Sequence, residues 1–166
     1  RCRFGRLYAA ARLNSGVRGQ DMEYRRALLD KLESLDRIDN EHFPIVSLDD
    51  YFIGNPQEDS IAPNQWGYGR PSIRDIYARL KEIEARPDVQ GVFVGLHQDW
   101  GESLEHSDLW PAAENIHIFS SAPQDIADQW IEGFESDGIG PGWPYGKHAA
   151  APEPPPGYQV YTIYWD

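Results

Sequence analysis

The sequence predicts an α+β protein, with a four-stranded antiparallel sheet, two helices on one face of the sheet, and a further helix near the N-terminus. Its 166 residues are 40% hydrophobic, which is typical of a domain that buries a core. Apolar residues recur every three to four positions, as in amphipathic helices, in the segments 22–37, 72–86 and 123–136. Strand-like alternation or β-branched and aromatic content marks the shorter segments 44–48, 89–97, 115–120 and 158–165.

Each predicted helix has an apolar stripe and a signal at one end. The stripes consist of Leu28, Leu32 and Leu35 in the first helix, of Ile73, Ile76, Tyr77, Leu80 and Ile83 in the second, and of Ile126, Trp130, Ile131 and Phe134 in the third. Ser72 begins the second helix with a capping-box pattern, and Pro87 ends it. The third helix stops before Gly138.

After the first helix, the predicted order is strand, helix, strand, strand, helix, strand. This is the split βαβ order of ferredoxin-like folds. The connection 49–71 is long for that fold. It follows Ser47, where a second capping box (Ser47-Leu-Asp-Asp50) predicts a short helical turn over 49–53 that Gly54 ends. The segment 138–157 is rich in proline and glycine and is predicted to be a loop.

Alternation in the strands predicts what each face of the sheet carries. The helix-facing set is Val92, Val94, Leu96, Ile116 and Ile118. The opposite set is Phe93, His97, His117 and Phe119, joined by Tyr161, Ile163 and Trp165 or else by Val160, Thr162 and Tyr164. RNA-recognition domains stack bases on such a face but also need cations, and the inner strands have none. We therefore expect no nucleic-acid binding, and we expect the N-terminal helix or the 138–157 loop to cover this face.

The charge distribution is the most specific feature of the chain, whose net charge is −12. From Pro87 to Gly146 there is no lysine or arginine. The acidic residues of this window are Asp88, Asp99, Glu102, Glu105, Asp108, Glu114, Asp125, Asp128, Glu132, Glu135 and Asp137. Such a block projects a negative potential that repels nucleic acids and anionic membranes and attracts basic partners.

Basic residues gather instead at the start of the chain, where residues 1–37 carry a balance of +4 against −16 for residues 38–166. We interpret residues 1–21 as a basic N-terminal extension upstream of Met22, and residues 22–166 as a single α+β domain. Cys2 is the single cysteine, which excludes an internal disulfide and favours a reducing compartment. No apolar stretch is long enough to span a membrane, so we expect a cytoplasmic location and no membrane partner.

Two polar groups have the composition of catalytic or metal sites. His97, Asp99 and His117 converge in the predicted sheet, but three ligands fall short of a closed transition-metal site, so we expect no metal and no cofactor. Asp49 and Asp50 have the chemistry of paired carboxylates, although the capping box explains them more simply. No nucleophile or phosphate-binding motif is present, so no catalytic residue is assigned. A hydrolase-like enzyme that uses Asp49, Asp50, His97 and Asp99 remains an alternative.

The run Ser47-Leu-Asp-Asp-Tyr-Phe-Ile-Gly-Asn55, with the Ser60-Ile61 segment after it, resembles a run found in a family of uncharacterised bacterial proteins. The resemblance covers residues 44–100 and the last few residues, and it implies no particular chemistry. By general type, a small, acidic, cysteine-poor α+β protein is also similar to the immunity proteins that bacteria pair with toxins.

We therefore expect an acidic protein-binding module, and most specifically an immunity-type protein that neutralises a basic toxin. The residues expected to contact the partner lie between the two central strands: Asp99, Glu102, Glu105 and Asp108 as charges, and Trp100 and Trp110 as aromatic anchors. Toxins that cut nucleic acids have cationic active sites, which an acidic loop occupies by mimicking phosphate charge. A structural or regulatory domain is the third hypothesis.

Overall fold

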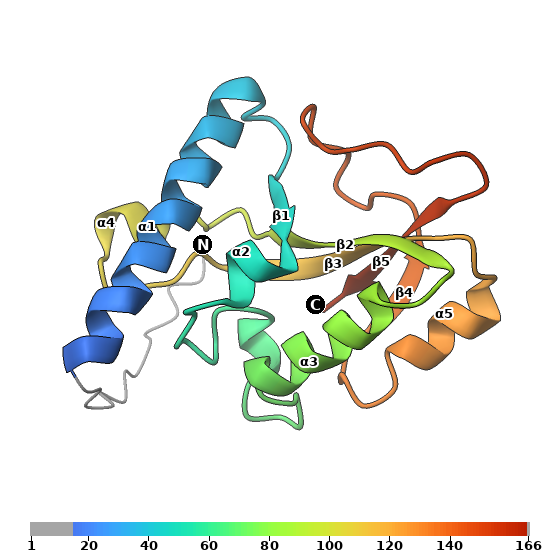
Figure 1. The fold of residues 1–166 in the computed structure, drawn as a ribbon, viewed down its shortest axis with the longest axis horizontal. Helices are drawn as coiled ribbons and strands as arrows, with labels where there is room; N and C mark the ends of the chain where they lie inside the picture. Colours follow the sequence, from blue (N-terminus) through green and yellow to red (C-terminus); the bar gives the residue numbers. More distant parts are fainter. Residues whose placement is uncertain (1–14, 166) are drawn as a thin grey trace.

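The computed structural model describes residues 15–165 and shows an antiparallel sheet with helices packed around it (Figure 1). Within these residues the elements are α1 (Ser15–Ile38), β1 (Ile45–Ser47), α2 (Leu48–Phe52), η1 (Pro63–Gln65), α3 (Ile73–Glu84), β2 (Val89–Leu96), α4 (Glu102–Glu105), β3 (Ala113–Ser120), α5 (Gln124–Trp130), β4 (Gly138–Pro141) and β5 (Gln159–Tyr164). None of these helices combines the length and the apolar character that crossing a membrane requires.

In the described part of the chain, the sheet has five strands in the order β1-β2-β3-β5-β4, and every neighbouring pair is antiparallel. This corrects the predicted four-stranded ferredoxin-like arrangement. A split βαβ unit separates its first two strands and runs them parallel, whereas β1 and β2 here are antiparallel neighbours. The α+β class and the antiparallel sheet are confirmed. The missed strand, β4, has the sequence Gly-Ile-Gly-Pro, whose composition does not favour a strand.

The main core lies between the sheet and helices α3 and α5, which Figure 1 shows on the same side of the sheet. The register sets Val94 opposite Ile116, and Ile116 opposite Ile163, so that these side chains form one apolar row. Trp130 of α5 packs edge-on against Tyr161 in this layer, with 6.2 Å between ring centroids. The predicted helix-facing residues of the two central strands are therefore confirmed.

The loop 142–157 covers the opposite face of the sheet, on the side away from α3 (Figure 1). Trp143 lies 4.5 Å from His117 and 6.0 Å from Phe119 between ring centroids. His117 is opposite Thr162 in the register. Of the two sets of β5 residues that the sequence left open for this face, the correct one is therefore Val160, Thr162 and Tyr164. Helix α1 does not cover this face, because it packs against α2 and the β2–β3 loop.

Local sequence signals place the helix starts well. The hydroxyl of Ser47 accepts from the Asp50 N–H at 3.1 Å, and the hydroxyl of Ser72 accepts from the Asp75 N–H at 3.2 Å. Helix α5 is shorter than predicted because Gly133 and Glu135 have positive φ angles, of 83° and 52°, which end the helix. Helix α1 begins within the predicted N-terminal extension, and residues 1–14 lie outside the described residues.

Candidate functional site

The acidic residues expected to contact a partner lie together on the β2–β3 loop, around the single turn of α4. Glu102, Glu105 and Asp108 are exposed, and half of the Asp99 side chain is exposed. Among the side chains that the structure describes, which are those of residues 19 and 21–165, neither Glu102 nor Glu105 has an ion pair. Leu104, between them, is 49% exposed and adds an apolar contact to this acidic surface.

The two tryptophans of the same loop are core residues, which corrects their predicted role as surface anchors. Trp100 is 9% exposed and Trp110 is 4% exposed, and both belong to the main hydrophobic core. The indole N–H of Trp110 donates to the Tyr51 carbonyl at 3.1 Å, which ties this end of the loop to α2. The exposed surface of this loop is therefore formed by the carboxylates and Leu104, while the indoles of Trp100 and Trp110 are buried beneath them.

Arg25 of α1 holds the acidic loop in place through hydrogen bonds to its backbone. Its guanidinium donates to the carbonyls of Leu109 at 2.8 Å and His106 at 3.0 Å, and also to that of Ser103. Burial lowers the pKa of Arg25, and the nearby Asp108 carboxylate opposes that shift. Sequence reasoning missed this contact because 84 residues separate Arg25 from Leu109.

His97 lies at the base of the acidic loop and does not join His117. Its Nδ1 accepts from the Asp99 N–H at 3.0 Å, and its Nε2 lies 3.4 Å from the Glu114 carboxylate. His117 is instead buried under Trp143. No group of three or more histidine, cysteine, aspartate or glutamate side chains within residues 15–165 is placed to hold a metal ion.

The aspartates of the alternative enzyme hypothesis point to different helices. Asp49 accepts from the Tyr77 hydroxyl at 2.6 Å and from Lys81 at 3.3 Å, both on α3. The Tyr77 hydrogen bond and Lys81 lower the pKa of Asp49, against a smaller opposing effect of burial. Asp50 pairs with Lys31 on α1. The structure therefore does not gather Asp49, Asp50, His97 and Asp99 into one catalytic group.

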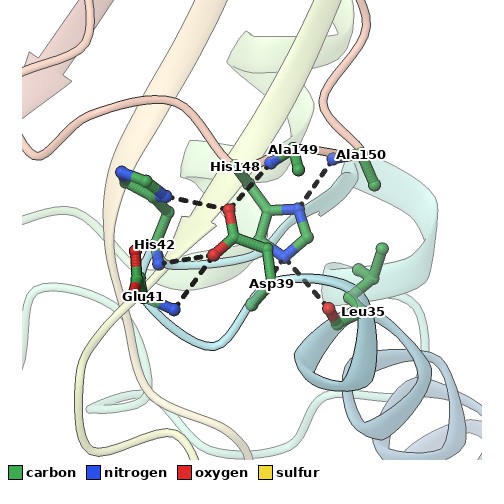
Figure 2. Close-up of polar contacts among 7 residues, drawn as sticks. All are labelled: Leu35, Asp39, Glu41, His42, His148, Ala149 and Ala150. Atoms are coloured by element: carbon green, nitrogen blue, oxygen red, sulfur yellow. Dashed lines mark hydrogen bonds and ion pairs between the residues drawn. The ribbon is translucent and has the colours of Figure 1, made fainter.

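A second polar cluster, which sequence reasoning missed, joins the end of α1 to the loop 142–157 (Figure 2). The Asp39 carboxylate accepts from the His42 ring at 2.8 Å and from the Ala149 N–H at 2.9 Å. Its other oxygen accepts from the N–H groups of Glu41 and His42, at 3.0 and 3.2 Å. Partial burial alone would raise the pKa of Asp39, but the hydrogen bonds from Ala149, His42 and Glu41 hold it well below its usual range.

His148 completes this cluster from the loop side and is almost fully buried. Its Nε2–H donates to the carbonyls of Leu35 at 3.1 Å and Asp39 at 3.0 Å, and its Nδ1 accepts from the Ala150 N–H at 3.0 Å. Both ring nitrogens are thus used inside the protein (Figure 2). These hydrogen bonds hold the loop 142–157 against α1, and we call the cluster of Asp39, His42 and His148 the clasp. No sequence motif indicates it.

The described residues thus define an α+β protein with an antiparallel sheet and an exposed acidic loop between β2 and β3. The chain belongs to the Uncharacterized protein YfbO family, whose model matches residues 23–163. It is 27% identical over 124 residues to the Uncharacterized protein YfbO of Escherichia coli (strain K12), across 74% of this chain and 83% of that protein. No solved structure matches the chain.

Proposed function

We propose that this protein binds a basic protein partner through the exposed carboxylates of the β2–β3 loop. The observation that carries the proposal is a loop with four acidic side chains, Asp99, Glu102, Glu105 and Asp108, that is fixed from below by buried tryptophans and from the side by Arg25. A loop that is already ordered loses little conformational entropy when it binds, which favours affinity.

The electrostatics support the same proposal. Because no lysine or arginine lies between Pro87 and Gly146, no cation of that segment neutralises the loop. Exposed carboxylates of this kind speed the encounter with a basic partner by roughly a hundredfold relative to unsteered docking. In its most specific form, the proposal is that the loop occupies the cationic active site of a toxin that cuts nucleic acid, as an immunity protein does.

The test is a kinetic measurement of binding at two salt concentrations. Basic proteins captured from the host, and the product of the neighbouring gene, are purified and passed over the immobilised protein. The variant Glu102→Lys/Glu105→Lys/Asp108→Lys should slow association strongly and change dissociation little, because exposed rim charges act mainly on encounter. Leu104→Ala should instead speed dissociation, because it removes apolar contact area.

A matched control variant distinguishes an effect of the acidic loop from an effect of the overall negative charge of the protein. The variant Asp125→Lys/Asp128→Lys/Glu132→Lys makes the same change in net charge at exposed positions of α5 and the turn after it. We expect it to slow association much less than the loop variant. Equal effects of the two variants, or binding that is insensitive to salt, would show that the loop is not the binding surface.

A further inference from the structure

Arg70 is a buried arginine whose hydrogen bonds are incomplete. It lies just before α3, its side chain is 0% exposed, and its guanidinium lies over the ring of Trp66 at 4.9 Å. Its Nη2 donates to the Glu58 carbonyl. Its Nε and Nη1 have no hydrogen-bond partner within the described residues. Because a buried cation is costly when its N–H groups are unpaired, further acceptors would stabilise it.

The carboxylates of Glu58 and Asp59 lie near Arg70, but both accept hydrogen bonds from other groups. The Glu58 carboxylate accepts from the Ile73 N–H at 3.0 Å and lies 3.9 Å from Arg70 Nη2, beyond hydrogen-bonding distance. The Asp59 carboxylate accepts from the Gln57 side chain at 2.8 Å. Burial lowers the pKa of Arg70, and the Glu58 carboxylate is the main group that opposes this shift. The charge of Arg70 is therefore only partly compensated.

The Glu58 carboxylate occupies the N-terminal end of α3. Ile73 is the first residue of this 12-residue helix, and the N–H groups of a first helical turn attract anions. The Glu58 side chain is 39% exposed, so a group that takes the place of its carboxylate can come from solution. With the unpaired N–H groups of Arg70 beside it, this end of the helix offers an anion more donors than Glu58 uses.

We propose that Arg70 and the N-terminus of α3 form a binding site for a small monocarboxylate, separate from the acidic β2–β3 loop. Glu58 is the internal carboxylate that occupies this site when no ligand is bound. The ligand replaces the Glu58 carboxylate, accepts from the Ile73 N–H and supplies an acceptor to the guanidinium, while the Glu58 side chain turns into solvent. A free carboxylate has no backbone tether, so it can approach the guanidinium as a planar acceptor of two N–H groups. A dianion is disfavoured because Glu58 and Asp59 remain close.

The experiment uses the full chain and acetate as the probe, with acetamide as the neutral molecule of matching shape and sodium chloride to keep the ionic strength constant. In NMR spectra, acetate should shift the signals of the Ile73 amide and of the Arg70 Nε–H group saturably. Acetamide should bind about tenfold more weakly, because hydrogen bonds to a charged acceptor are stronger than those to a neutral one.

A pair of glutamate variants locates the site, and neither variant changes the core. Glu58→Gln keeps the size of the competing side chain but removes its charge, so acetate should bind about tenfold more tightly. Glu82→Gln, at an exposed position of α3, makes the same change in net charge and should leave the affinity for acetate nearly unchanged. The proposal is overturned if acetate causes no saturable shift in the unchanged protein, if acetamide binds as tightly as acetate, or if Glu58→Gln binds acetate no more tightly than Glu82→Gln.

Discussion

His117 is a buried base in the middle of the sheet, so its protonation is linked to folding. Its ordinary pKa of 6.5 falls to about 3 in the folded protein. Between these values the unfolded chain binds the proton and the folded chain does not, so acid favours unfolding. We expect His117 to lower the free energy of unfolding by about 2–3 kcal/mol between pH 6.5 and 4.5.

Urea unfolding at a series of pH values measures this effect. His117→Gln should flatten the decline of stability between pH 6.5 and 4.5 relative to the unchanged protein. His106→Gln, at an exposed histidine of the acidic loop, should leave the decline unchanged. A decline that is the same in the His117 variant would mean that the folded protein accommodates the charged ring.

A substitution of Trp130 tests whether this side chain belongs to the hydrophobic core. It is 6% exposed, it packs on Tyr161, and Arg86 lies over its ring at 5.3 Å. Trp130→Ala should lower the free energy of unfolding by about 3–5 kcal/mol, as expected when a large buried side chain is removed. Trp66→Ala, at a position that is 41% exposed, should cost clearly less. Equal losses in urea unfolding would contradict this assignment of the core.

Among the structural elements, α4 and its loop depend on a contact from α1. Arg25→Ala removes the hydrogen bonds to the carbonyls of Ser103, His106 and Leu109. Backbone amides of residues 103–109 should then exchange with deuterium roughly a hundredfold faster, because the three lost hydrogen bonds contribute on the order of 1 kcal/mol each. Arg26→Ala, at the exposed neighbouring position, is the control. Exchange that increases equally in both variants would mean that Arg25 does not hold the loop.

The sequence predicted those elements whose signals are local. Ser47 and Ser72 mark helix starts because their hydroxyls bond to backbone only three residues away. The strand order was not predictable in the same way, since β5 pairs with both β3 and β4 through contacts between distant segments. Strand β4 was missed because its pairing with β5, and not its own composition, makes it a strand.

The candidate site, too, has features that the sequence predicted and features that it did not. The charge pattern of the sequence alone identifies the carboxylates of the site, without any knowledge of the fold. Whether Trp100 and Trp110 point inward was not predictable, because a loop has no periodicity from which to infer the buried side. The clasp of Asp39 and His148 escaped notice because it brings together backbone groups and side chains more than 100 residues apart.

For the whole molecule, the net charge of −12 predicts a stability that depends on salt. Repulsion among carboxylates opposes the compact state. Raising the ionic strength from about 0.01 M to about 0.15 M shortens the screening length from roughly 30 Å to roughly 8 Å, so sodium chloride should raise the melting temperature. The triple lysine variant of the loop has half the net charge and should gain less from salt. A melting temperature that falls with salt would mean that attractive ion pairs dominate.

The place of β5 in the sheet has a consequence for biosynthesis. It lies between β3 and β4, although it follows both along the chain. While the ribosome is still making residues 142–164, β3 exposes an unpaired edge and β4 has no partner. At about 5–20 residues per second this interval lasts on the order of seconds. During that time the open edge of β3 can pair with another nascent chain, so the protein is most exposed to aggregation just before β5 emerges.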